Sequence, residues 1–138
     1  MKVVFLRLRI IHALFVFTWI AFLLITIYII HPADKLEGMT LPLAFGVAAL
    51  SGISVAQTVR QKMVVAPAEE LARQPDNAAL LQRWFTGNIV QFAFAESITL
   101  VGLSLRLLGA SWTVAAPFFA VGLLLLLLSP PSDPSKKF

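Results

Sequence analysis

Four long apolar stretches constrain the fold of this 138-residue chain more than any other feature of its sequence. They cover about residues 10–30, 41–59, 84–108 and 112–128. Each approaches or exceeds the ~20 apolar residues that a helix needs to cross ~30 Å of hydrocarbon. Backbone amides find no partner in lipid, and the runs are too long and too unalternating for barrel strands. The sequence therefore predicts an all-α, integral membrane four-helix bundle that forms one transmembrane domain over residues 1–138.

The basic side chains are distributed unequally between the two ends of these predicted spans. Lys35 and Arg106 fall on one side, and the remaining ones fall on the other: Lys2, Arg7, Arg9, Arg60, Lys62, Arg73, Arg83, Lys136 and Lys137. Because cytoplasmic segments are enriched in Lys and Arg, both termini, a loop at about 64–82 and a flexible, proline-rich tail at 129–138 are predicted to be cytoplasmic. The expected location is a bacterial inner membrane. The basic residues form no patch with interleaved aromatics, so no nucleic-acid partner is expected.

Small residues recur every four positions along the second predicted span. They form a row on one helix face: Ala44, Ala48, Gly52 and Ala56. Such rows let two helices approach closely in lipid. We therefore expect this helix to pack against a neighbour, with the third span as its partner.

The loop at about 64–82 is the largest segment expected outside the membrane. Pro67 suits the first turn of a helix, which predicts a short helix that ends near Arg73. Asp76 is expected to cap the next helix, which would run from Asn77 through Leu108.

Glu96 lies near the centre of the third predicted span. At ~1.5 Å of helical rise per residue, it is roughly 20 Å from Arg83 and roughly 15 Å from Arg106. Ionisable groups at such depth are costly, and they often mark ion or proton pathways. Other polar side chains lie on or beside the same helix face, which gives a candidate proton- or cation-binding site of four residues: Glu96, Gln91, Thr99 and Asn88.

Other chemistry has little support in the sequence. The chain has no cysteine, and no catalytic triad, phosphate-binding loop or metal-ligand spacing is present, so we expect neither an enzyme nor a metal or cofactor. His12 and His31 are 19 residues apart, roughly 28 Å along one helix, so they cannot hold one haem between them. Both histidines are interpreted as interfacial residues.

Two motifs carry a resemblance that covers about half the chain. The first is Ala72-Arg73-Gln74-Pro75-Asp76, and the second is the segment 94–103, which contains Glu96. With the small-residue helix before them, they resemble the hairpin of the rotary ATP synthase c subunit, the proteolipid. The resemblance implies ion binding at Glu96 and partner docking through Arg73, Gln74 and Pro75.

The first and fourth predicted helices are foreign to a simple proteolipid. A distant relative or an analogue is therefore expected, not a working rotor subunit. The chain is also similar to uncharacterised small four-span bacterial membrane proteins that begin with an Arg-Ile-Ile-His-like segment.

Two functions stay open at this point. The first is a non-enzymatic membrane subunit, associated with itself or with other membrane subunits, whose Glu96 binds or relays a proton or cation. The alternative is a structural accessory subunit in which Glu96 only pins helices together.

Overall fold

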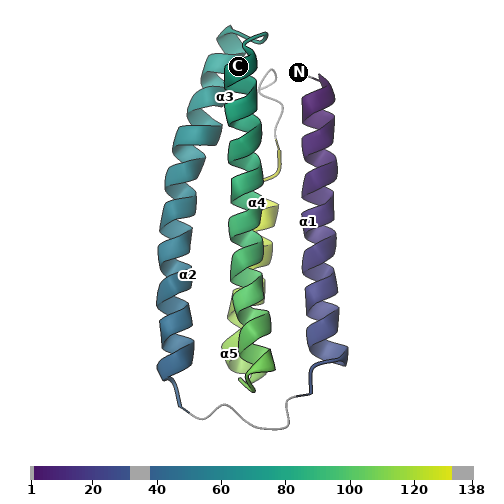
Figure 1. The fold of residues 1–138 in the computed structure, drawn as a ribbon, viewed down its shortest axis with the longest axis vertical. Helices are drawn as coiled ribbons and strands as arrows, with labels where there is room; N and C mark the ends of the chain where they lie inside the picture. Colours follow the sequence, from purple (N-terminus) through teal and green to yellow (C-terminus); the bar gives the residue numbers. More distant parts are fainter. Residues whose placement is uncertain (1, 32–37, 132–138) are drawn as a thin grey trace.

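A computed structural model describes residues 2–31 and 38–131, and over these ranges the chain is helical and contains no strand. The elements are α1 (Lys2–Tyr28), α2 (Thr40–Val59), a π-helical segment η1 (Arg60–Val65), α3 (Ala66–Arg73), α4 (Ala78–Leu107) and α5 (Trp112–Leu128). In Figure 1, α1 and α4 run downward and α2 and α5 run upward. The predicted all-α fold is confirmed. The sequence predictions for Lys35, Lys136, Lys137 and the tail from residue 132 onward lie outside the described residues.

Three helical rods are long and apolar enough to cross a membrane: α1, the continuous run Thr40–Arg73, and α4. The fourth predicted span corresponds to α5, which has 17 residues and is entirely apolar except for Thr113. Its ~25 Å of helical rise is at the lower limit for a transmembrane helix.

The short helix expected to begin at Pro67 and to end near Arg73 is confirmed, so little of the segment 64–82 lacks helical structure. Thr40–Arg73 forms one rod of 34 residues, and the connection to α4 is confined to residues 74–77. A short helix with Pro67 in its first turn does form, but it continues directly from η1. Proline has no N–H to donate to the carbonyl four residues earlier, which favours the wider turn: the Ala66 N–H donates to the Gln61 carbonyl, five residues back.

Both ends of α4 are fixed by local hydrogen bonds. The Asn77 side chain accepts from the Leu80 N–H at 3.2 Å, so Asn77 is the N-cap and the prediction of Asp76 was one residue early. At the other end Gly109 has φ +91°, and the Ala110 N–H donates to the Leu105 carbonyl at 2.9 Å. This is the Schellman arrangement, which ends a helix because glycine tolerates the left-handed conformation.

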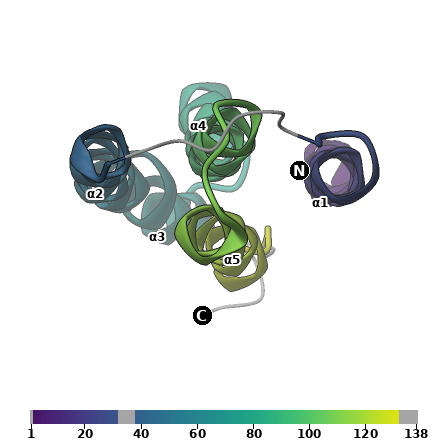
Figure 2. The same ribbon diagram turned by 90° about the horizontal axis from the view of Figure 1, so that it is seen from below.

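Helix α4 is the centre of the molecule. Viewed from below in Figure 2, α1 and α2 lie on opposite sides of α4 and α5. Helix α4 contacts α1, α2, η1, α3 and α5. Helices α1, α3, α4 and α5 all contribute to the main core cluster, which consists of Leu8, Leu71, Trp84, Phe92, Ala95 and Leu126. The helices therefore pack around α4, and not around a core shared equally by four helices.

The outer faces of the long helices are apolar. Large side chains such as Leu14 and Phe17 on α1 and Leu43 and Leu50 on α2 are more than half exposed. Exposed apolar surface of this extent suits lipid or a neighbouring subunit. Along α5, Leu126 is fully buried against the core while Leu124 and Leu127 are more than half exposed, so one side of the run 123–128 packs inward.

Candidate functional site

Glu96 is buried in the middle of α4. Only 7% of its surface is exposed, and neither carboxyl oxygen has a hydrogen-bond partner among the described residues. Buried polar side chains almost always have a partner in folded proteins. Among the described residues, the other buried side-chain atom without a partner is Arg106 Nε, whose guanidinium bonds through Nη1, so Glu96 is the one whose polar atoms all lack a partner.

The packing of its neighbours shows which helices Glu96 faces. Residues four apart share a helix face, and Phe92, one turn earlier, packs its ring 5.0 Å from His12 and 5.6 Å from Phe15 of α1. Thr99, nearly one turn later, lies against Gly122 of α5. Glu96 thus lies on the part of α4 that faces α1 and α5. Gly87, on the opposite side of α4, contacts η1 instead.

Two hydrogen bonds join α1 to α5 at the levels above and below Glu96. His12 Nε2 lies 2.9 Å from the Leu126 carbonyl oxygen, and Trp19 Nε1 donates to the Phe119 carbonyl oxygen at 3.0 Å. Because a carbonyl oxygen only accepts, the His12 bond requires a proton on Nε2. Leu126 belongs to the last turn of α5, whose carbonyls have no partner within the helix. His12 therefore caps the end of α5.

Close approach of α5 to α4 completes the surroundings of the site. A Cβ atom on Gly122 would overlap the Thr99 hydroxyl and would lie 3.0 Å from the Ala95 carbonyl oxygen. A Cβ atom on Gly102 would lie 2.9 Å from the Phe119 ring. The absence of side chains at these two glycines lets the helices meet at this level.

The other residues of the predicted site do not bind Glu96. The Asn88 amide donates to the Trp84 carbonyl at 2.8 Å, and the Thr99 hydroxyl donates to the Ala95 carbonyl at 3.2 Å. Both side chains are buried, but they bond to their own helix four residues back. Gln91 is half-buried, and its amide makes no hydrogen bond to the carboxyl oxygens of Glu96, whose partners were sought among the described residues. None of the other three predicted site residues therefore hydrogen-bonds to the Glu96 carboxyl group.

The small-residue row of α2 packs differently from the expectation. Ala44 and Ala48 are exposed, and a Cβ atom on Gly52 would meet nothing within 4 Å. Of the four residues in the row, Ala56 alone is buried. Within one chain, most of this row therefore stays exposed, and Ala56 alone can contribute to the packing of α2.

The predicted docking residues lie at the connection between α3 and α4. Arg73 ends α3, and Gln74 and Pro75 follow it; all three are exposed. The Asn77 amide donates to Gln74 Oε1 at 3.2 Å, which holds the turn together. This turn lies at the same end of the molecule as the start of α1 (Figure 1).

His12 and Trp19 were missed as site residues by the reasoning from sequence. His12 was interpreted as interfacial, but its ring packs inside the bundle against Phe92. A signal was present, because the inward-facing positions of α1 recur at alternating spacings of four and three residues: Leu8, His12, Phe15 and Trp19. This spacing is typical of a helix seam.

Comparisons with protein-family models, with curated proteins and with solved structures find no match for this chain. The likeness to the ATP synthase c subunit therefore rests on the residues quoted above.

Proposed function

We propose that this protein is a non-enzymatic integral membrane subunit whose Glu96 binds a proton or cation and supports its passage across the membrane. The observation that carries the proposal is the burial of a carboxyl group that has no partner among residues 2–31 and 38–131, at the centre of a helix long enough to span a bilayer. A carboxyl group in such a position can be neutralised by a proton or by a bound cation.

The competing proposal, a structural accessory subunit in which Glu96 only pins helices, has less support. Pinning requires a hydrogen bond from Glu96 across a helix interface. No described side chain supplies one, and the joining of α1 to α5 is already achieved by the His12 and Trp19 bonds.

The distribution of charge supports a bacterial inner-membrane location with both termini in the cytoplasm. The end of the molecule that contains the start of α1, η1 and the residue 74–77 turn carries most of the described basic residues: Lys2, Arg7, Arg9, Arg60, Lys62, Arg73 and Arg83. Arg106 lies at the opposite end, where its guanidinium donates to the Ala110 carbonyl and stacks 4.9 Å from the Trp112 ring. This asymmetry follows the positive-inside rule.

The same proposal includes association with further copies of the chain or with other membrane subunits. The exposed part of the small-residue row, Ala44 and Ala48, offers a face that another transmembrane helix can approach closely. The exposed turn with Arg73, Gln74 and Pro75 is the proposed docking point for a cytoplasmic partner.

Reaction with dicyclohexylcarbodiimide tests the site in purified protein. This apolar reagent partitions into lipid and modifies protonated carboxyl groups, so we expect modification at Glu96 and its loss in Glu96→Gln. Glu70, which is exposed on α3, provides the matched control: Glu70→Gln should leave the modification unchanged. Protection of Glu96 by added Na⁺ would identify a cation site, and insensitivity to Na⁺ would favour a proton. Failure to modify Glu96 at every pH would remove the basis of the proposal.

A further inference from the structure

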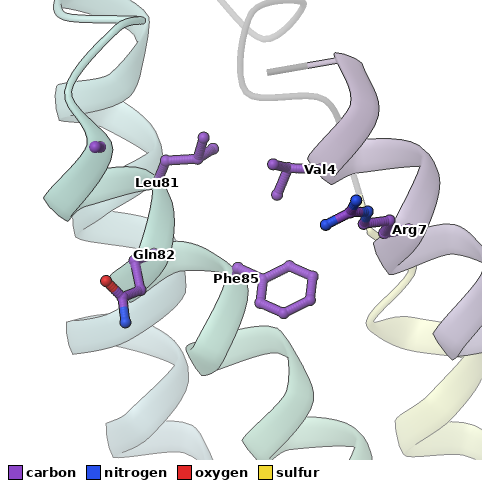
Figure 3. Close-up of a pocket in the computed structure, with 6 residues that line it drawn as sticks. Val4, Arg7, Leu81, Gln82 and Phe85 are labelled. Atoms are coloured by element: carbon purple, nitrogen blue, oxygen red, sulfur yellow. The ribbon is translucent and has the colours of Figure 1, made fainter.

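A groove of about 240 Å³ lies between the beginning of α1 and the beginning of α4. Its lining comes from two helices: Val4 and Arg7 on α1, and Ala78, Leu81, Gln82 and Phe85 on α4. In Figure 3 the Arg7 guanidinium points from α1 toward α4, and the Phe85 ring points from α4 toward α1. Arg7, Ala78 and Gln82 are exposed and the other three are half-buried, so the groove opens outward from an apolar floor.

The groove lies at the level where a lipid headgroup would meet the acyl chains. The basic residues Arg7 and Arg9 immediately precede the apolar run of α1, and basic residues at the end of an apolar run are typical of a membrane interface. Lipids at this level present phosphate to Arg7 and acyl chains to Val4, Leu81 and Phe85.

Charge and size both favour an anionic lipid over other occupants. Among the described lining residues Arg7 is the one charged side chain, and the guanidinium group matches phosphate with two parallel N–H bonds. The volume is below the ~300–1,000 Å³ typical of pockets that enclose a whole small molecule. It suits a ligand that inserts one part and leaves the rest in the bilayer.

We propose that this groove binds an anionic phospholipid, with the phosphate on Arg7 and one acyl chain along Val4, Leu81 and Phe85. Gln82 donates a further hydrogen bond to the headgroup. The lipid fills the space between α1 and α4 at the basic end and thereby fixes the position of α1. The proposal requires a membrane location but is independent of the role of Glu96.

Native mass spectrometry of the full chain tests this proposal, with equimolar phosphatidylglycerol and phosphatidylcholine in the detergent micelles. We expect phosphatidylglycerol adducts to dominate in the wild type. Arg7→Gln should reduce them about tenfold, the effect expected when a direct hydrogen bond to a charged group is lost. The matched control is Arg9→Gln, which removes the same charge from the same helix; Arg9 lies over the Phe5 ring, outside the groove, and its loss should change the adducts less than twofold.

A second variant tests the apolar part of the groove without changing the charge. Ala78→Phe fills the groove from the exposed start of α4 and should reduce the phosphatidylglycerol adducts as strongly as Arg7→Gln does. Both positions are exposed, so the folded structure should survive either change. Equal losses in Arg7→Gln and Arg9→Gln would mean attraction by diffuse surface charge, and would overturn the proposal. Unchanged adducts in Ala78→Phe would place the lipid elsewhere and would overturn it too. Carbodiimide modification of Glu96 should be the same in all three variants.

Discussion

At the scale of single residues, the buried hydroxyl and amide side chains among the described residues bond within their own helices, whereas both carboxyl oxygens of Glu96 lack a partner. The buried hydroxyls of Thr26 and Thr99 donate to the carbonyls of Phe22 and Ala95 on their own helices. Such bonds keep a hydroxyl out of contact with hydrocarbon at small cost, but they also make it unavailable to a neighbour. Ionised Glu96 has no such local solution, because a carboxylate is only an acceptor and the helix N–H groups around it are already used.

The His12 bond to the end of α5 gives a prediction at this scale. His12→Phe keeps an aromatic ring against Phe92 but leaves the Leu126 carbonyl without its donor. Loss of one net hydrogen bond should lower the free energy of unfolding by about 1 kcal/mol. The control is His31→Phe, since His31 is exposed and its ring lies 3.3 Å from the nearby Ile29 carbonyl oxygen. Thermal unfolding in detergent, followed by circular dichroism, measures both. Equal stability of the two variants would contradict a capping role for His12.

At the scale of helices, the positions of glycines determine where neighbouring helices pack closely against α4. Gly87 meets the backbone of η1, and Gly102 and Gly122 meet side chains across the contact between α4 and α5. In each case the partner backbone or ring occupies the space that a side chain would need. Helix α2 has glycines as well, but Gly46 and Gly52 have nothing within 4 Å of the Cβ position. The position of a glycine in the packing, and not its presence in a helix, therefore determines its effect.

The contact between α4 and η1 gives a prediction with a matched control. A Cβ atom on Gly87 would lie 2.6 Å from the Met63 carbonyl oxygen, which is backbone and cannot rotate away. Gly87→Ala should therefore cost about 1–3 kcal/mol of stability through overpacking. Gly46→Ala, in open space, should be neutral or stabilising, because alanine is favoured over glycine in a helix by up to about 1 kcal/mol. Thermal unfolding of the two variants checks this, and a loss of stability in Gly46→Ala equal to that in Gly87→Ala would contradict it.

Hydropathy predicted the helices well and the connections poorly. The predicted span 41–59 agrees with α2. Hydropathy finds the part of a helix that can lie in lipid and not the whole helix, so the first predicted span begins near residue 10 although α1 begins at Lys2. Pro67 predicted the short helix at 66–73, but the sequence did not indicate that this helix continues from α2 through η1 or that Leu71 is fully buried in the core. A helix of eight residues with few apolar positions is too short to be found by hydropathy, and Pro67 was the signal that predicted it.

The candidate site was predictable only in its central residue. Glu96 was identifiable because an acidic residue within an apolar span is rare. Its surroundings were not, because helix periodicity shows which residues of α4 share a face but not which helix covers that face. The row from Ala44 to Ala56 formed a clear pattern in sequence, whereas the glycines at 102 and 122 are isolated between bulky residues. The contact between α4 and α5 therefore had no repeating signal.

At the scale of the whole molecule, the antiparallel order of the helices separates two ends of different charge. The start of α1 and the turn at residues 74–77 lie at one end, and the turn at Gly109 and the start of α2 lie at the other (Figure 1). If the chain spans a membrane, the first pair must face one compartment and the second pair the opposite one. The positive-inside rule assigns the first pair to the cytoplasm.

The chain contains no cysteine, so single introduced cysteines can test this orientation directly. Gln74→Cys and Ser111→Cys place thiols at exposed positions at opposite ends. In intact cells, a thiol reagent that cannot cross the membrane should label Ser111→Cys and leave Gln74→Cys unlabelled until the membrane is opened. Lys2→Cys should behave like Gln74→Cys. Labelling of Lys2→Cys and Gln74→Cys from opposite sides would contradict the arrangement of helices.

Ion flux through reconstituted liposomes tests the role of Glu96 most directly. Wild-type protein, and Glu96→Gln matched for the amount of folded protein, would be compared under a proton gradient and then under a Na⁺ or K⁺ gradient. We predict a flux in the wild type that falls to the background of protein-free liposomes in Glu96→Gln and is partly retained in Glu96→Asp. Equal flux in the wild type and Glu96→Gln, or no flux in the wild type under any gradient, would contradict a role for this carboxyl group in translocation.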